Sequence, residues 1–234
     1  MLEKSYRRSD EMKALPPIMI GVPICQSAEK YLSQFLEGIE KLNYPRFELV
    51  FSDNSGSDTF REKLRQVPNA TVLEREPTDN ANENILSSMV QLRGHFMDKG
   101  YLNSLLILES DIVPQPDTLN VLVNEDKEII GCPYYLSKDM MMINLFEPWG
   151  EPKSIIPEDY IRFYQSLPLM RVWNCGFGCT LIKRHILENY EFHLKKTDWR
   201  CVDSVFSEDM CERKIPVYCK TNHLVRHLRV EEVE

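Results

Sequence analysis

The sequence predicts an α/β fold in which a mixed but mostly parallel sheet is sandwiched by helices. In the first half of the chain, short apolar runs alternate with longer segments whose apolar residues recur at helical spacing. This alternation is typical of parallel strands joined by right-handed crossover helices. The length of 234 residues and the hydrophobic content of 43% suffice for one sizeable core. We therefore expect a polar N-terminal arm at 1–17 and a single domain at 18–234.

The first half is expected to contain four strands separated by three helices. Each strand candidate is a short apolar run, and turn-forming residues lie between the elements. The first helix candidate has Ser27 in position to cap it and Glu29 in its first turn. The strands are predicted at 18–25, 47–53, 70–76 and 105–108, and the helices at 27–42, 59–67 and 80–100.

After Asn120 the regular alternation ends and the predicted elements become shorter. A loop carrying Gly176 and Gly178 precedes a strand and a helix within 172–187. Residues 202–214 are expected to be helical in their second half only. The remaining predictions are a strand at 128–136, a hairpin at 140–155, a short helix at 158–167, a strand at 215–220 and an acidic tail at 230–234.

The composition argues against several classes of protein. The formal net charge of −8 disfavours a nucleic-acid partner, because DNA and RNA binders usually carry a basic face. No apolar run approaches the about 20 residues that cross a bilayer, and the polar N-terminus has no signal-peptide core. The seven cysteines are scattered and odd in number, which favours reduced thiols over a disulfide framework. We therefore expect a cytoplasmic protein without a transmembrane segment.

Polar residues follow three of the predicted strands. They lie at Pro23–Gln26, Ser52–Asp58 and Glu109–Asp111. Ligands of open α/β sheets bind beyond the carboxyl ends of the strands. We therefore expect these three segments to border one shared pocket.

Glu109 and Asp111 are separated by one residue, so on a strand they project from the same side. Two neighbouring carboxylates repel each other, and a hard divalent cation removes that penalty. Mn²⁺ and Mg²⁺ prefer oxygen ligands and often complete their shells with substrate phosphates. The motif therefore predicts a metal–phosphate site, although the same triplet also fits a solvated strand end.

Six segments, in this order, resemble those of nucleotide-sugar glycosyltransferases of the GT-A fold, especially glycosyltransferase family 2. They are "IMIGVPIC", "YPRFELVFSDNSGSD", "LLILESDIVPQPDTL", "CGFGCTLIKR", "SEDMCERKIPVYC" and "LVRHL". The resemblance runs from about Ile18 to about His227. It implies a GT-A-like domain whose 18–124 half binds the nucleotide sugar and whose 125–234 half binds the acceptor. It also implies metal-dependent transfer of a single sugar from a UDP- or GDP-linked donor to an acceptor hydroxyl.

The resemblance assigns most donor-binding residues to the strand ends. Asp53 would hydrogen-bond the base, and Asn80, Asn84 or Arg93 would stand in for an Arg-Asn pair that the family often carries in the helix before the strand that ends at Glu109. Glu109-Ser110-Asp111 stands where the family has Asp-x-Asp, with Glu replacing the first Asp. The complete implied set is Pro23, Ile24, Cys25, Asp53, Asn84, Arg93, Glu109, Ser110, Asp111, Gly176, Phe177 and Gly178.

The resemblance also implies metal ligands and a catalytic base. Asp111 would bind Mn²⁺ or Mg²⁺ directly, Glu109 would reach it through water or contact the ribose, and His227 would complete the shell, with His223 as its competitor. Arg226 and Arg229 flank His227 and can neutralise diphosphate oxygens. Glu208 and Asp209 match the Glu-Asp pair of inverting members. Asp209 would then take the proton from the acceptor hydroxyl.

Several alternatives remain open at the level of sequence. Cys211, Cys219, His223 and His227 contain zinc-binding residue types, but their spacing departs from that of structural zinc sites. A nucleotidyltransferase uses a similar sheet, although "GVPICQSAEKY" lacks the Gly-rich basic loop of those enzymes. A nucleotide-sugar-binding module without turnover and a retaining glycosyltransferase are further alternatives. The acceptor is expected to be a carbohydrate, a lipid-linked group or a protein.

Overall fold

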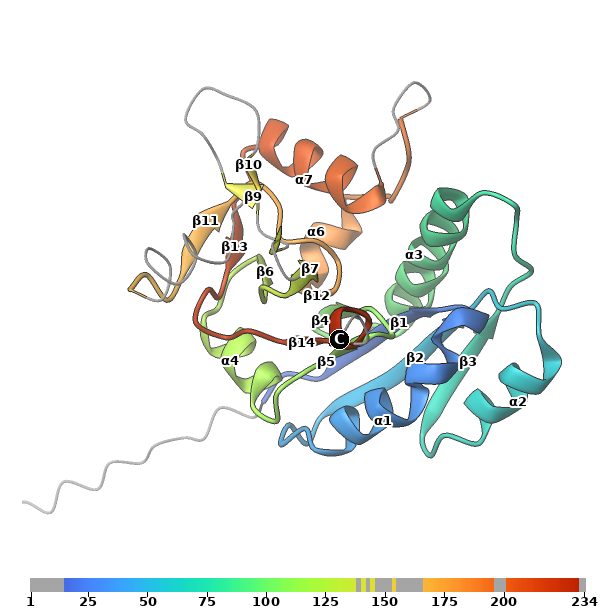
Figure 1. The fold of residues 1–234 in the computed structure, drawn as a ribbon. Coiled ribbons are helices and arrows are strands. Elements are labelled where there is room, and N and C mark those ends of the chain that lie inside the picture. The colour runs from blue at the N-terminus through green and yellow to red at the C-terminus, as the bar shows by residue number, and fades with distance from the viewer. Residues whose placement is uncertain are drawn as a thin grey trace, which may run out of the picture.

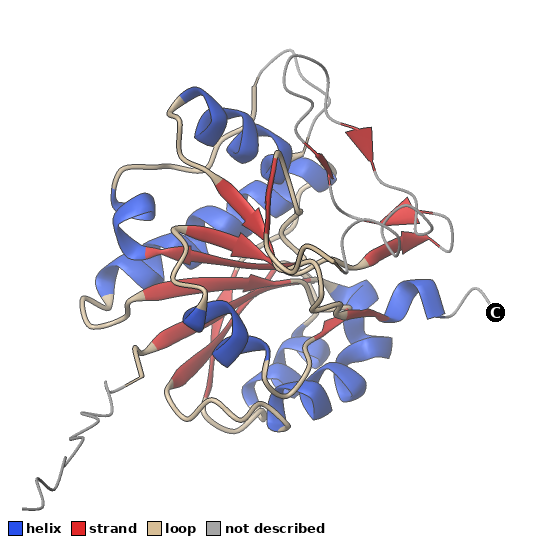
Figure 2. Ribbon diagram, turned by 90° about the vertical axis from the view of Figure 1, so that its left-hand side faces the viewer, coloured by secondary structure: helices blue, strands red, loops and turns tan. Residues whose placement is uncertain are grey.

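A computed structural model of the chain describes residues 15–137, 166–195 and 201–231, together with three short strands between 140 and 154. Most of the predicted arm and the predicted helix at 158–167 lie outside the described residues. Within the described part, one sheet of eight strands has the order β11-β13-β6-β12-β4-β1-β2-β3. Helices lie on both sides of this sheet (Figures 1 and 2). The predicted fold is confirmed.

The first half forms the parallel part of the sheet. β1 (Ile18–Ile24) lies between β2 (Phe47–Asp53) and β4 (Ser104–Leu108), and β3 (Ala70–Glu74) follows β2 at the edge. The connecting helices are α1 (Leu32–Glu40), α2 (Asp58–Arg65) and α3 (Ala81–Asp98). Ser57 caps α2 by accepting from the Phe60 amide, and Asn80 caps α3 by accepting from two amides. The predicted helix 27–42 is divided into a 3₁₀ turn, η1 (Gln26–Tyr31), and α1.

The second half adds the antiparallel part. β12 (Cys179–Lys183) runs antiparallel to both β4 and β6 (Ile129–Gly131). β13 (Val217–Cys219) then pairs in parallel with β6, and β11 (Met170–Val172) closes this edge. The predicted strand 128–136 is two strands, β6 and β7 (Tyr135–Ser137), because the chain leaves the sheet at Cys132. The other helices of the described residues are α4 (Thr118–Asn124), α6 (Arg184–Glu188), α7 (Val202–Glu212) and α8 (Leu228–Glu231).

Alternate strand residues divide the core between the two faces of the sheet. Met19, Leu105 and Ile107 pack with α3, α6 and α7 on one face. Ile18, Ile20, Leu106 and Leu108 pack with α1, α2 and α4 on the other. Both faces of β1 and β4 are buried, so nearly every residue of these strands is apolar, and each strand is a continuous apolar run in the sequence.

A small two-stranded sheet lies next to the carboxyl end of β4. β14 (Arg226–His227) pairs antiparallel with β5 (Ile112–Val113), so His227 lies opposite Ile112. The Leu228 amide also donates to the Asp111 carbonyl. The C-terminal segment is therefore fixed next to the two acids that follow β4. In the short sheets further along, β9 (Asn144–Leu145) pairs with β10 (Lys153–Ser154), as the predicted hairpin requires, and β8 (Met140–Met141) pairs with β7.

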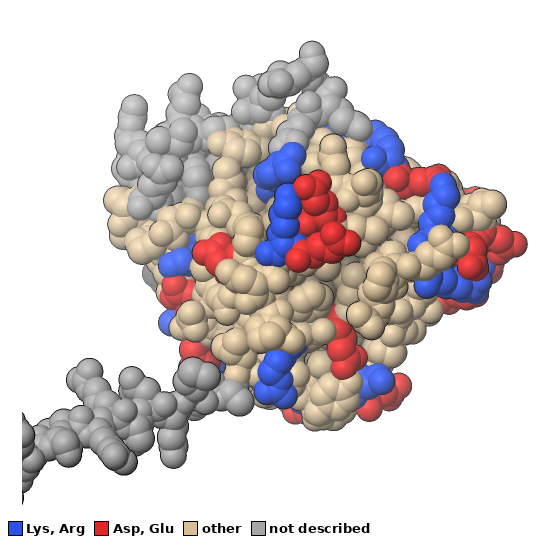
Figure 3. Space-filling view, turned by 90° about the horizontal axis from the view of Figure 1, so that it is seen from below, with Lys and Arg blue, Asp and Glu red and all other residues tan. Residues whose placement is uncertain are grey.

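Three further features of the structure bear on the predictions made from composition, namely the distribution of surface charge, the hydropathy of the helices and the state of the cysteines. On the face shown in Figure 3, Lys and Arg side chains lie beside Asp and Glu side chains rather than forming one continuous basic area. No helix in the described part of the chain is both long enough and apolar enough to span a membrane. All seven cysteines are free thiols, as predicted.

Candidate functional site

A cavity of about 300 Å³ opens at the carboxyl ends of β1 and β4. The strand-end segments predicted to share a pocket meet here. Pro23, Ile24 and Cys25 border one part of the cavity, and Glu109, Ser110, Asp111 and His227 border another. The parallel order of the strands explains this meeting, because their carboxyl ends lie along one edge of the sheet.

Asp111 and His227 face each other across the cavity floor. The His227 Nε2 lies 3.3 Å from the Asp111 Oδ2. The other ring nitrogen, Nδ1, lies 2.6 Å from the Tyr135 carbonyl oxygen. A carbonyl only accepts hydrogen bonds, so Nδ1 must carry a proton. In the neutral ring, Nε2 then directs a lone pair at a carboxylate, an arrangement that requires a proton or a cation between the two groups.

Asp111 and His227 each stabilise the charged form of the other. Burial alone would raise the pKa of Asp111, but the hydrogen bond and charge of His227, with the charge of Arg229, hold that pKa below its ordinary value. Burial alone would lower the pKa of His227, but its hydrogen bonds to Asp111 and to the Tyr135 carbonyl raise it. The Arg229 Nη2 lies 3.3 Å from the Asp111 Oδ2, and its side chain is 68% exposed. Arg229 therefore offers positive charge to a ligand at the mouth of the cavity.

Glu109 adds a second acid whose charge is poorly balanced. Loss of hydration, followed by the nearby charges of Asp111 and Asp203, raises the pKa of Glu109 to about 7. The Glu109 carboxylate is thus repelled by two others, and the opposing charges of His227 and Arg229 offset this repulsion only in part. A bound cation would relieve this repulsion.

The residues present fit a divalent cation that is completed by its substrate. Asp111 and His227 supply the oxygen and nitrogen ligands that Mn²⁺ accepts, and Mg²⁺ commonly needs only one or two carboxylates plus phosphate oxygens. Among the described residues, no three His, Cys, Asp or Glu side chains form a ready-made metal cluster. A cation held here would therefore take its remaining ligands from phosphate and water.

The structure separates the four residues of the zinc alternative. His223 lies elsewhere in the core, with its Nε2 2.8 Å from the Thr118 Oγ1. Cys219 is fully buried in the sheet, whereas His227 borders the cavity. These residues do not converge, so the zinc site is not formed. The same positions favour His227 over His223 as the neighbour of Asp111.

Tyr134 lines the cavity and contacts both His227 and Gly178. Its ring packs edge-to-face against His227 at 5.7 Å, and its hydroxyl accepts from the Gly178 amide at 3.3 Å. The Gly178 carbonyl accepts in turn from the Glu109 amide. Gly178 therefore joins Tyr134 to the acidic strand end without lining the cavity itself.

Replacing Gly178 with alanine is expected to destabilise the protein by about 1–3 kcal/mol, because the new methyl group would overpack the site. Its Cβ would lie 2.4 Å from the Tyr134 Cε1 and 2.5 Å from its Cζ. The matched control is Gly94→Ala in α3, where nothing lies within 4 Å of the added Cβ. Denaturant unfolding should show a loss for Gly178→Ala only. Equal stability of the two variants would contradict the packing role of Gly178.

The structure places Asn54, rather than Asp53, at the cavity. The Asp53 side chain is fully buried, its Oδ2 accepts from the Arg61 Nε at 3.0 Å, and its Oδ1 accepts from the Ser55 amide. Asn54 lies at the cavity surface, and its Nδ2 is turned inward, 3.3 Å from the Ser88 Oγ and 3.5 Å from the Asn84 carbonyl oxygen. Its Oδ1 is thereby left to face a ligand.

Other residues assigned by resemblance lie away from the cavity lining. The Asn84 side chain bonds to the Thr78 backbone, and the Arg93 Nε donates to the Leu187 carbonyl of α6. Phe177 is buried against Phe192 and Phe206. Gly176 forms a turn with a φ of 68°, which favours glycine. These residues organise the surroundings of the site and do not border the cavity.

The expected base, Asp209, also lies away from the cavity. Its Oδ2 accepts from the Tyr190 hydroxyl at 2.9 Å and lies 3.4 Å from the His193 Nε2. Its neighbour Glu208 is paired with Lys195. Both acids lie in the second half of α7, where they join this helix to the segment before it.

Asp203, in the first turn of α7, also lies outside the cavity lining, but its charge acts on two residues that line it. Its charge raises the pKa values of Glu109 and Tyr134, both of which line the cavity, after the larger effect of their burial. Its Oδ2 accepts from the Asn174 Nδ2 at 3.2 Å, and its Oδ1 accepts from the Ser204 amide at 2.7 Å. The Asn174 Oδ1 accepts from the Gly176 amide, which ties this acid to the glycine loop. The sequence analysis did not consider Asp203, which lies nearly two turns before Asp209 in α7.

The architecture matches that of solved glycosyltransferases. The mannosyltransferase PcManGT from Pyrobaculum calidifontis, in complex with GDP-Man and Mn²⁺, matches with a TM-score of 0.62 and 16% identity over 92% of this chain and 58% of that chain. S. aureus TarS 1–349 in complex with UDP-GlcNAc matches with a TM-score of 0.54 and 14% identity over 90% of this chain and 55% of that chain. This chain has the GT-A fold.

The GT-A match concerns the fold. This chain spans 58% and 55% of the lengths of these two neighbours. No protein-family model and no curated protein matches the sequence. This chain therefore shares the GT-A architecture with proteins to which it is only 14–16% identical. Its chemistry has to be argued from the arrangement of its own side chains.

Proposed function

We propose that this chain is a glycosyltransferase that uses Mn²⁺ or Mg²⁺ to transfer a single sugar from a UDP- or GDP-linked donor to an acceptor hydroxyl. The observation that carries the proposal is the Asp111–His227 pair, in which the His227 Nε2 and the Asp111 Oδ2 lie 3.3 Å apart. This pair lies in a cavity at the strand ends, with Arg229 beside it. The GT-A neighbours solved with GDP-Man and Mn²⁺ and with UDP-GlcNAc support the same ligand class.

The diphosphate would bind between the acids and the C-terminal segment. Asp111 and His227 would hold the cation, and Arg229 would pair with diphosphate oxygens. The cation, when bound, would stabilise the negative charge that develops on the leaving diphosphate. Burial of Asp111 and His227 strengthens these interactions, because the local dielectric is lower than that of water.

The base would bind between Asn54 and the turn that follows β1. Ile24 and Ala28 supply buried apolar surface there, and Asn54 presents its Oδ1. Uracil and guanine carry a ring N–H that this oxygen can accept, whereas cytosine has a lone pair at its ring N3. We therefore expect Asn54, in place of Asp53, to contact the base of a uracil or guanine nucleotide.

Asp203 would be the general base of an inverting reaction. It would take the proton of the acceptor hydroxyl as that oxygen attacks the anomeric carbon, which is a contribution of roughly 10²–10⁴-fold. Asn174 and the Ser204 amide hold its two oxygens, so the carboxylate has a defined orientation. The acceptor is a carbohydrate, a lipid-linked group or a protein. NMR of the product's anomeric signal distinguishes inversion from retention.

A thermal-shift titration tests donor binding in the full chain. UDP and GDP are added with and without Mn²⁺, and UDP- and GDP-sugars are then screened for turnover against an acceptor panel. Nucleotide at about 100 times its Kd should raise the Tm by about 5–10 °C, and only when Mn²⁺ is present. If neither nucleotide shifts the Tm with Mn²⁺, the proposed function is wrong.

A further inference from the structure

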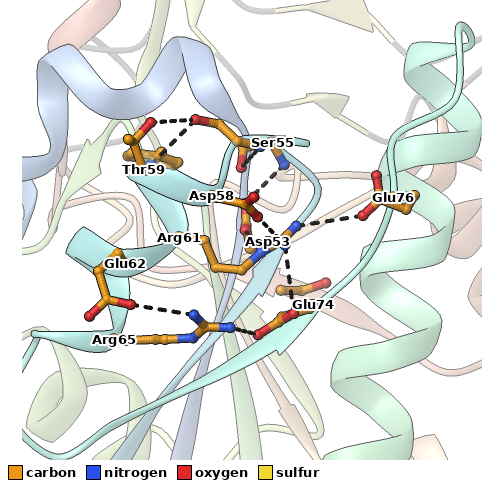
Figure 4. Close-up of polar contacts among 12 residues, drawn as sticks. Asp53, Ser55, Asp58, Thr59, Arg61, Glu62, Arg65, Glu74 and Glu76 are labelled. Carbon is orange, nitrogen blue, oxygen red and sulfur yellow. Dashed lines mark hydrogen bonds and ion pairs between the residues drawn. The ribbon is translucent and has the colours of Figure 1, made fainter.

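Arg61 and Asp53 form a buried ion pair directly behind the proposed base subsite. The Arg61 Nε donates to the Asp53 Oδ2 at 3.0 Å, and the side chains are 9% and 0% exposed. Figure 4 shows Arg61 reaching from α2 to Asp53 at the end of β2, with Glu74 and Glu76 on its far side. Its contacts with Asp58, Glu74 and Glu76 are longer, at 3.2, 3.6 and 3.8 Å. Asp53 is therefore the principal partner of this guanidinium.

The same carboxylate also holds the backbone on the other side of Asn54. The Asp53 Oδ1 accepts from the Ser55 amide at 2.9 Å, so residues 53–55 form a closed turn around Asn54. The Asn54 amide donates to the Ile24 carbonyl, and the Asp53 carbonyl accepts from the Arg75 amide. Asn54 thus reaches the cavity from a turn whose shape depends on the position of the Asp53 carboxylate.

Removal of Arg61 would leave that carboxylate buried and without its counter-charge. Burying an unpaired charge is costly, so Asp53 would be expected to rotate toward water. This rotation would release the Ser55 amide, and with it the turn that carries Asn54. The outward direction of the Asn54 Oδ1 would then no longer be fixed, although the cavity floor at Asp111 and His227 would be untouched.

We propose that the Asp53–Arg61 ion pair is a positioning pair for nucleoside recognition, acting through Asn54 to select bases that carry a ring N–H. The inference rests on the proposed function, because it assumes that a nucleotide occupies the cavity. Neither Asp53 nor Arg61 contacts the ligand in this scheme. Their effect is therefore expected on the choice of base more than on the diphosphate or the cation.

The experiment measures Kd values of UDP, GDP and CDP by calorimetry at saturating Mn²⁺, for the wild type and for Arg61→Lys. Lysine keeps the charge but lacks the directed Nε–H bond to Asp53. The matched control is Arg65→Gln. Arg65 pairs with Glu62 and Glu74 on the exposed side of the same network and does not touch Asp53. A lysine variant that fails to fold is replaced by Arg61→Gln, which keeps an N–H donor without the charge.

The wild type is expected to bind UDP or GDP, or both, at least about tenfold more tightly than CDP, since a mismatched buried acceptor is left unsatisfied. Arg61→Lys should reduce this preference about fivefold or more, and Arg65→Gln should leave it unchanged. In an Asn54→Leu background, Arg61→Lys should cause no further change in the preference, because the pair acts through Asn54.

The outcomes separate the inference from the function on which it rests. A wild type that binds no nucleotide with Mn²⁺ contradicts the proposed function itself. A wild type that binds UDP, GDP and CDP equally contradicts only base selection by Asn54. An unchanged preference in Arg61→Lys, or an equal loss in Arg65→Gln, overturns the positioning role of the pair.

Discussion

Replacing Asp111 with asparagine is expected to weaken Mn²⁺-dependent UDP and GDP binding by roughly 100-fold or more. Asparagine keeps the size of the side chain but removes the negative charge that faces the His227 Nε2 and Arg229. An amide is a poorer ligand for a hard cation than a carboxylate, and loss even of a supporting partner typically costs 10–100-fold in metal affinity. The change is largest here because Asp111 and His227 are the side chains that would hold the cation.

The measurement is calorimetric titration of UDP and GDP with and without Mn²⁺, together with the Tm of each variant. Asp117→Asn is the matched control, because Asp117 also lies near a histidine, 4.0 Å from the His223 Nε2, but outside the cavity lining. It should bind like the wild type. Unchanged Mn²⁺-dependent binding in Asp111→Asn would show that the cation is held elsewhere.

Asp203→Asn is expected to reduce sugar transfer by roughly 10²–10⁴-fold while UDP or GDP binding stays within about twofold of the wild type. The amide cannot accept a proton in the transition state, but its oxygen can still accept from the Ser204 amide. The binding step should be preserved because Asp203 lies outside the cavity lining. The loss should therefore appear in kcat rather than in the Kd of the nucleotide.

Asp209→Asn is the matched control for this variant, since both acids lie on α7. It weakens the contacts with Tyr190 and His193, so we expect a lower Tm but transfer at a rate near that of the wild type. Single-turnover transfer to the best acceptor of the panel separates the two variants. Loss of transfer in Asp209→Asn with activity retained in Asp203→Asn would return the role of base to Asp209.

The strand ends were predictable because sheet geometry and local sequence agree. Apolar runs buried on both faces identified β1, β2 and β4, and the polar residues after them had to lie along one edge of a parallel sheet. Glu109 and Asp111 were expected to project from one side of a strand. β4 instead ends at Leu108, and the two acids lie in the turn before β5, where both border the cavity. His227 followed from the resemblance, and the pairing of β14 with β5 brought it to the same edge.

Two expectations differ from the structure by a few residues along the chain. The segment 202–214 was expected to be helical only in its second half, and the resemblance, rather than this helix boundary, assigned Asp209 as the base. α7 begins at Val202, so the first-turn acid is Asp203. At the end of β2, Asp53 and Asn54 are adjacent and both polar. Successive side chains point in opposite directions, so a shift of one residue exchanges the buried partner of Arg61 for the cavity residue.

The sequence by itself determined the class of fold, the alternation of strands and helices in the first half and the acids that follow β4, because these depend on local periodicity. Only the tertiary structure decided which of two histidines faces Asp111, which acid of α7 raises the pKa of Glu109, and that Asp53 is paired internally with Arg61. These choices depend on contacts between segments far apart in the chain. Burial and the pairing of charge set them, and neither is visible in the spacing of residues.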